Sequence, residues 1–294
     1  MLPVIVGPTA SGKTDLAVIL AERHEGEIVS ADSVQVYRRF DVGTGKPTTL
    51  QRESVPHHLI DVADPLEPMD AARWAGLAEA AIADIRSRGK LPILCGGTFL
   101  WVRALLFGLA PTPPADARVR ERHAVRAAGA GRAALHAELS RVDPQSAARL
   151  APNDFVRVSR ALEVYELTGR SLSSYHAEHG FREPRYVARL LGIGHARDAL
   201  NLRIAERTRR MLAAGWVDEV KILLRDGLGA ARAMSSVGYH QIAEQLRTGS
   251  DASGLEESIR RATRVFARRQ RTWLRDEPVE WLAPELAERG EVVL

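Results

Sequence analysis

The sequence predicts an α/β fold in which a parallel sheet is flanked by helices and interrupted by an all-helical insertion. Short apolar runs at 4–6, 27–30 and 91–95 have the length and composition of buried strands. Segments with helical periodicity lie between them, at 13–24 and 71–88. Strands that alternate with helices in this way predict a parallel sheet.

The insertion is predicted from a change in pattern after Pro111-Thr112-Pro113-Pro114. The segment that follows, to about residue 175, is rich in Ala and Arg and has helical but no strand character. A strand-like run at 186–193 then returns to the sheet, and a long helical region ends the chain. We therefore expect a catalytic core formed by residues 1–115 and 183–294, and an inserted helical subdomain at 116–182.

Composition indicates a globular cytoplasmic protein. The chain has 294 residues, of which 45% are apolar, and it shows neither a basic leader nor an apolar run of about 18 residues. Its one cysteine, Cys95, has no internal disulfide partner, so we expect a core thiol. The net charge is +4 and Arg far outnumbers Lys, which fits phosphate-bearing partners or, equally, a GC-rich genome.

A phosphate-binding loop is the strongest single motif. Residues Gly7 to Thr14 fit G-x-x-x-x-G-K-[ST] between a predicted strand and a predicted helix. In such a loop, backbone amides and the helix N-terminus bind phosphate, Lys13 adds a positive charge and the Thr14 hydroxyl is a ligand for Mg²⁺. The predicted diphosphate-binding residues of the loop are Gly7, Pro8, Thr9, Ala10, Ser11, Gly12, Lys13 and Thr14.

An unusual position of the acidic residue argues against an ordinary ATPase. Many P-loop enzymes hold Mg²⁺ with an Asp at the end of a later strand, but the strand at 91–95 runs into Gly96-Gly97-Thr98. The acid follows the second strand instead, at Asp32, on the sheet edge that the P-loop also occupies. Asp32 is therefore a candidate general base or metal ligand; a turn cap is the alternative.

Further motifs resemble, in order and spacing, those of the bacterial tRNA dimethylallyltransferases, the IPP transferase family. The resemblance extends over nearly the whole chain. Besides the P-loop, the matching segments are 30–37, 41–47, 57–61, 96–98, 153–163, 203–207, 237–241 and 268–275.

This resemblance implies that dimethylallyl diphosphate donates its five-carbon group to N6 of the adenosine at tRNA position 37, beside the anticodon. Asp32 matches the family's general base, and Thr98 would position the reacting amine or a diphosphate oxygen, although a turn cap is again the alternative. Lys13, Mg²⁺, Arg203 and Arg207 would stabilise the departing pyrophosphate. The predicted catalytic residues are Asp32, Thr98, Lys13 and Arg207.

The same resemblance implies a surface for tRNA. Because the target adenine must leave its stack, we expect Ser33, Val34 and Gln35 to receive it beside Asp32. A helix at 260–275 carries seven arginines, with Ile259, Ala262, Phe266 and Trp273 available as anchors. It is either a phosphate-tracking surface or a solvated basic face. The other predicted tRNA contacts are Arg120, Arg157 and Arg160 in the inserted subdomain, and Gly238, Tyr239, His240, Gln241, Arg268 and Arg271.

Two other functions share part of this pattern. A nucleotide-dependent kinase would also use a P-loop, and a non-catalytic RNA-binding regulator would need only the basic helix. The adjacent residues His57 and His58 point to opposite sides of a strand, so we expect a structural role for them and no metal site. We expect a monomer, because no heptad seam or large apolar stripe is evident.

Overall fold

The computed structural model describes residues 1–249 and 251–294, which form two compact units. One unit comprises residues 1–106 and 185–294, and the other comprises residues 107–184. The first boundary lies before the predicted one, because the proline-rich segment attaches to the insertion. Arg160 donates hydrogen bonds to Thr112 Oγ1 at 3.1 Å and to the Pro113 carbonyl at 2.7 Å.

Within the described residues, six strands form one sheet in the order β3-β2-β4-β1-β5-β6, and all neighbouring pairs are parallel. This arrangement confirms the predicted α/β class. The strands are β1 (Leu2–Val6), β2 (Gly26–Ala31), β3 (His57–His58), β4 (Leu91–Gly96), β5 (Ala188–Ile193) and β6 (Val279–Leu282).

The sheet aligns the ends of its central strands. Gly96 of β4 pairs in register with Val6 of β1 and with Ala31 of β2. The P-loop, Asp32 and the Gly97-Thr98 turn therefore leave the sheet at the same carboxyl edge, where ligands bind in open α/β sheets.

Of the two edge strands, β3 confirms the strand position expected for His57 and His58, whereas β6 was missed in the sequence. β3 has only two residues, and β6, whose middle residues are exposed, lies in a region predicted to be helical. Glu280 of β6 forms an ion pair with Arg189 of the neighbouring β5 at 2.6 Å. β6 has only four residues and is interrupted by Glu280, so it lacks the longer apolar run by which a buried strand is recognised.

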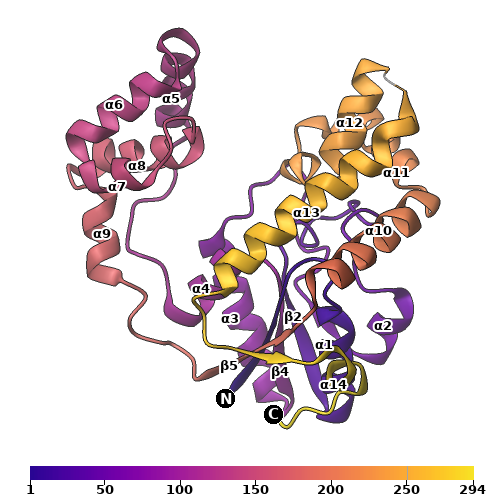
Figure 1. The fold of residues 1–294 in the computed structure, drawn as a ribbon. Helices are drawn as coiled ribbons and strands as arrows, with labels where there is room; N and C mark the ends of the chain where they lie inside the picture. Colours follow the sequence, from indigo (N-terminus) through magenta and orange to yellow (C-terminus); the bar gives the residue numbers. More distant parts are fainter. Residues whose placement is uncertain (250) are drawn as a thin grey trace. The chain divides into compact units, whose positions relative to one another are not determined.

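Helices cover the sheet, as Figure 1 shows. Leu16 and Leu20 of α1 are buried in a cluster with sheet residues such as Ile5 and Ile93. Trp74 is buried in the core, and its ring stacks on Trp101 with centroids 5.1 Å apart. The helices of this unit are α1 (Lys13–Arg23), α2 (Thr49–Ser54), α3 (Ala71–Ser87), α4 (Phe99–Phe107), α10 (Arg197–Ala213), α11 (Trp216–Arg225), α12 (Tyr239–Thr248), α13 (Leu255–Leu274) and α14 (Pro284–Arg289).

The inserted unit is all-helical, as predicted. Its core is formed by Leu135, Leu139, Val158 and Leu162. No helix among residues 1–249 and 251–294 has both the length and the apolar content needed to cross a membrane. The inserted helices are α5 (Ala117–Ala130), α6 (Arg132–Val142), α7 (Pro144–Arg149), α8 (Phe155–Thr168) and α9 (Leu172–His179).

A buried ion pair on β2 predicts a pH-dependent stability. Glu27 accepts hydrogen bonds from Arg88 at 2.9 Å and from His58 at 2.7 Å. The Arg88 hydrogen bond lowers the pKa of Glu27 from 4.5 to about 2. Folding therefore favours the carboxylate, and this stability is present above the unfolded pKa and lost as the pH falls through the folded pKa.

We expect Glu27→Gln to lower the free energy of unfolding by about 1–2 kcal/mol at neutral pH, because the ion pair with Arg88 is lost. The loss is limited to this size because the Arg88 side chain is half-exposed and water can solvate it. The difference between wild type and variant should shrink as the pH falls from 4.5 to about 2. Urea unfolding of both proteins across this range measures it. A difference that does not change with pH would contradict the assignment.

Candidate active site

The P-loop joins β1 to α1 in the conformation that phosphate binding requires. Gly12 lies in the left-handed region with φ of 89°, and Ala10, which has a side chain, also has a positive φ of 64°. Successive turns of this kind direct backbone amides toward one point, and the N-terminus of α1 adds a partial positive charge there. Lys13 and Thr14 are the first residues of this helix.

Three side chains from the second half of the chain hold the P-loop backbone. His195 lies 2.8 Å from the Ser11 carbonyl through Nε2, which must carry the proton because a carbonyl only accepts. Arg203 Nε donates to the Ala10 carbonyl at 2.8 Å, and Gln270 Oε1 accepts from the Thr9 amide at 2.8 Å. The sequence did not indicate His195 or Gln270. The Thr9 amide is therefore already bonded, and the Ser11 amide donates to the Pro8 carbonyl at 3.3 Å.

Two cavities meet beside Lys13. One, of about 350 Å³, includes Asp32 and Thr98 in its lining, and the other, of about 730 Å³, includes Arg203. A group bound where they meet is accessible from both sides. The residues that line both cavities are Lys13, Thr14, Gly45, Pro47, Arg207 and Met211.

Two buried cations, Lys13 and Arg207, lie at the junction of the cavities, and the carboxylates near them include Asp32 and Asp15. Burial lowers the pKa of Lys13, and the Asp32 carboxylate opposes this shift. Burial likewise lowers the pKa of Arg207, again with Asp32 acting in the opposite direction. Arg207 Nη2 donates to the Thr44 carbonyl at 3.3 Å. The structure thus brings together Lys13, Arg203, Arg207 and Asp32, as the sequence predicted.

Asp32 has one oxygen engaged in a turn and one directed elsewhere. Its Oδ1 accepts from the amides of Val34 at 2.9 Å and Gln35 at 3.2 Å. The turn cap considered as an alternative is therefore present, and it fixes the orientation of the carboxylate. Thr98 contributes to the same turn, since its Oγ1 accepts from the Ser33 amide at 3.0 Å. Asp32, Ser33 and Thr98 form one small constellation.

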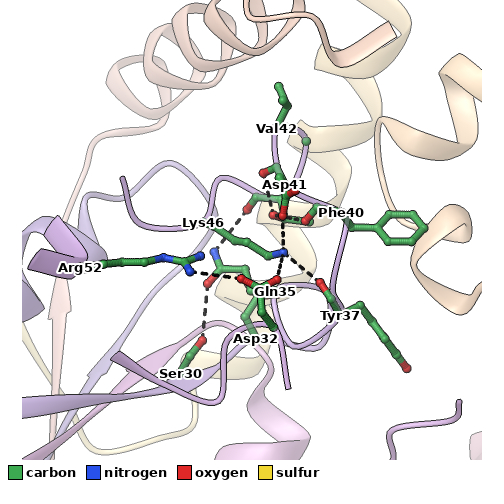
Figure 2. A network of polar contacts seen from close by, with 12 residues as sticks. Ser30, Asp32, Gln35, Tyr37, Phe40, Asp41, Val42, Lys46 and Arg52 are labelled. Atoms are coloured by element: carbon green, nitrogen blue, oxygen red, sulfur yellow. Dashed lines mark hydrogen bonds and ion pairs between the residues drawn. The ribbon is translucent and has the colours of Figure 1, made fainter. Parts of the chain in front are cut away.

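The loop after Asp32 is held by a buried lysine that the sequence did not single out. Lys46 Nζ donates to the Tyr37 carbonyl at 2.9 Å and to Asp41 Oδ1 at 2.6 Å, and it forms an ion pair with Asp61 at 2.5 Å. Figure 2 shows these contacts converging on the ammonium group, with Arg52 on the other side of the network. The side chain of Lys46 is only 5% exposed. This network fixes the wall that faces Asp32.

Gln35 also contacts this loop. Its Nε2 donates to the Thr44 carbonyl at 3.3 Å and to the Gly45 carbonyl at 3.1 Å. The side chain lines the smaller cavity but is engaged with the protein backbone. Its pairing with the adenine edge stays a prediction, and such pairing would require these bonds to exchange.

A second support comes from α11 and α12. Glu219 accepts from the amides of Asp41 at 3.0 Å and Val42 at 2.7 Å, and Tyr239 accepts from the Gly43 amide at 3.1 Å while donating to Glu219. Burial raises the pKa of Tyr239, so its hydroxyl stays protonated. The side chain of Tyr239 is fully buried and supports this loop, and the predicted contact of Tyr239 with tRNA stays a prediction.

The neighbours of Tyr239 divide between structure and surface. Gln241 accepts from the Gly238 amide at 2.6 Å and caps α12, whereas His240 is exposed. Gly238 has a φ of 90°, and a Cβ there would lie 1.9 Å from Trp216. A Cβ on Gly43 would also lie 1.9 Å from Trp216. These two glycines therefore make room for a buried indole that the sequence analysis missed.

Comparison with known proteins agrees with this geometry. Residues 35–277 match the family IPP transferase, and residues 1–62 match the family Isopentenyl transferase. A protein named tRNA dimethylallyltransferase from Sorangium cellulosum is 61% identical over 282 residues, which are 96% of this chain and 90% of that protein. The chain belongs to the IPP transferase family.

Solved structures give the same result. A tRNA isopentenylpyrophosphate transferase from Bacillus halodurans is 37% identical with a TM-score of 0.71, and the match covers 96% of this chain and 89% of that one. A eukaryotic dimethylallyltransferase acting on tRNA is 26% identical with a TM-score of 0.81, and the match covers 96% of this chain and 73% of that one. Each of these matches covers 96% of this chain, so each includes residues of both compact units.

The basic helix of this IPP transferase is α13. Ile259 is buried as predicted, but Phe266 and Trp273 are 41% and 50% exposed, so their role as anchors is wrong. The helical phase instead turns Ala267 and Leu274 inward. Within the described part of the chain, Arg268, Arg269 and Arg271 are exposed and form no ion pair.

The arginines predicted to contact tRNA in the inserted unit have partners there. Arg120 and Arg160 both bind Glu163, whose side chain is fully buried, at 3.0 Å and 2.5 Å. Arg157 forms an ion pair with Asp154, the N-cap of α8, and its side chain is 71% exposed. Glu163 requires its two partners, so we assign them a structural role first. Their contact with tRNA stays a prediction.

The Lys46 network predicts a stability effect. We expect Lys46→Met to lower the free energy of unfolding by about 1–3 kcal/mol, because three charge-assisted hydrogen bonds are lost and the carboxylates of Asp41 and Asp61 lose their shared partner. Thermal and urea denaturation measure it. Lys90→Met, which removes an exposed pair with Glu25, is the matched control and should change little. Equal effects of the two substitutions would refute the role of Lys46.

Proposed function

We propose that this chain transfers the dimethylallyl group from dimethylallyl diphosphate to N6 of the adenosine at position 37 of tRNA, releasing pyrophosphate. The observation that carries the proposal is the meeting of two cavities at Lys13 and Arg207, with Asp32 on one side and the P-loop on the other. This arrangement suits two substrates that enter from opposite sides. A carboxylate faces the acceptor and cations face the leaving group.

The larger cavity suits the donor. The amides of the P-loop, Lys13, Arg203 and Arg207 are placed to bind the diphosphate. When the bond between the allylic carbon and oxygen breaks, negative charge develops on the pyrophosphate and positive charge on the five-carbon group. Fixed cations and amides that stabilise this charge accelerate the departure.

The smaller cavity suits the acceptor. The N6 amine of adenine is a weak nucleophile, because its lone pair is delocalised into the ring. As N6 bonds to the allylic carbon, its proton passes to the free oxygen of Asp32, while Oδ1 stays bonded to the turn. Ser33, Val34 and Thr98 line the surrounding space.

Mg²⁺ fits the donor side. Thr14 lines both cavities at the start of α1 and offers a hydroxyl oxygen, and the described residues contain no cluster of three acidic, histidine or cysteine ligands. This donor set suits Mg²⁺, which keeps several waters and takes the rest of its ligands from substrate phosphates. When bound, the ion would neutralise charge on the diphosphate.

The tRNA would lie on α13 and enter the smaller cavity with one base. The exposed arginines 268, 269 and 271 are available for backbone phosphates, and Phe266 lines this cavity. An adenine that leaves its stack in a loop needs less energy than one in a duplex. One chain supplies all of these groups, so we propose that a monomer is active.

The reaction can be tested directly. Purified protein, Mg²⁺ and radiolabelled dimethylallyl diphosphate should transfer label to an unmodified tRNA with adenosine 37. The same tRNA with guanosine 37 should remain unlabelled, and ATP given alone should release no phosphate. Phosphate release from ATP without label transfer would support a kinase and overturn the proposal.

We expect Asp32→Asn to lower kcat by about 10²–10⁴-fold. The side-chain oxygen of Asn can still accept hydrogen bonds from the backbone amides of Val34 and Gln35, but the side chain cannot take a proton from N6. The affinities for tRNA and pyrophosphate should stay close to those of the wild type. Single-turnover kinetics and binding titrations measure both. A variant with near-normal kcat would show that Asp32 only caps the turn.

A further inference from the structure

Gln270 connects two loops of the active site from the buried face of α13. Its side chain is 7% exposed. Oε1 accepts from the Thr9 amide at 2.8 Å, and Nε2 donates to the Gly97 carbonyl at 3.0 Å. The amide thus bonds once to the P-loop and once to the turn that precedes Thr98.

The turn is shaped to admit this side chain. A Cβ on Gly97 would lie 2.5 Å from Gln270 Nε2, so the Gln270 amide would have to move from its present position. A Cβ on Gly96 would lie 2.2 Å from the Ala31 carbonyl, so that glycine serves the contact between β4 and β2. Gly96 therefore allows the close contact between β4 and β2, whereas Gly97 leaves room for the Gln270 side chain.

The opposite face of the same helix carries the free positive charge. Ala267, Gln270 and Leu274 follow helical spacing and are buried. Arg268, Arg269 and Arg271 alternate with them and are exposed. These three arginines therefore lie within one helical turn of Gln270.

We infer that Gln270 is a positioning residue that couples tRNA binding on α13 to the geometry of the P-loop and of Thr98. tRNA phosphates that bind the basic face hold α13 in place, so that the existing hydrogen bonds of Gln270 to the Thr9 amide and the Gly97 carbonyl persist and diphosphate is bound more tightly when tRNA is present. The inference rests on the proposed function for the identity of the two ligands. It adds a link between them.

The coupling can be measured without catalysis. Inorganic pyrophosphate is titrated into the full-length protein with Mg²⁺, in the absence and presence of saturating unmodified tRNA. We expect tRNA to tighten pyrophosphate binding by about fivefold or more in the wild type. Gln270→Met keeps the side-chain volume but removes both hydrogen bonds. In this variant, the factor by which tRNA tightens pyrophosphate binding should fall to about one. The affinity for tRNA itself should change less than about twofold, since the arginines are intact.

A matched control and a second variant complete the test. Thr272 is an exposed residue on the same helix, and its hydroxyl donates to the Arg268 carbonyl at 3.1 Å. Thr272→Val should therefore keep the wild-type degree of coupling between tRNA and pyrophosphate binding. Gly97→Ala displaces the Gln270 amide from the other side and should reproduce the loss even if Gln270→Met folds poorly. The double variant should be no worse than either single one, because both remove the same link.

The outcomes separate this inference from the proposed function. Loss of coupling in Gln270→Met and Gly97→Ala, with normal coupling in Thr272→Val, supports the inference. Absence of coupling in the wild type, or its retention in both variants, overturns it, whether or not label is transferred to tRNA. Failure of label transfer by the wild type overturns the proposed function and leaves the binding measurement intact.

Discussion

The P-loop backbone is the constraint on which the rest of the site depends. Phosphate binding requires amides that point inward, so the chain adopts positive φ at Ala10 and Gly12 and its carbonyls point outward. These outward groups need donors. His195 and Arg203 supply them, and Gln270 adds a contact to the Thr9 amide. An N-terminal loop thus acquires its active form only when the C-terminal half of the chain is folded against it.

Distant parts of the chain also hold the side of the site that contains Asp32. The sheet places the end of β2 beside the ends of β1 and β4, which brings Asp32 to the P-loop. One carboxylate oxygen orders the turn, and the other stays available for chemistry. Lys46 and Glu219 then hold the facing loop from two directions. Binding of a flipped base needs walls of this kind, because a mobile loop would lose entropy when it closes on the ligand.

Charge is divided between internal and external roles. Arg120 and Arg160 neutralise the buried Glu163 inside the inserted unit, whereas Arg268 and Arg271 on α13 face solvent. The arginine excess of the sequence therefore has at least two uses. Desolvated carboxylates need a paired cation, and tRNA phosphates need cations that are still free.

The sequence by itself determined the α/β class, the P-loop, Asp32, Thr98 and the basic character of α13, because each depends on local spacing or on residue chemistry. It did not reveal β6, and it placed Phe266 and Trp273 on the wrong side of α13. Gln270 lies 261 positions from Thr9, and Glu219 lies 178 from Asp41. Only tertiary structure decided these contacts, since a polar side chain carries no local signal of a distant partner and becomes a support only when packing removes it from water.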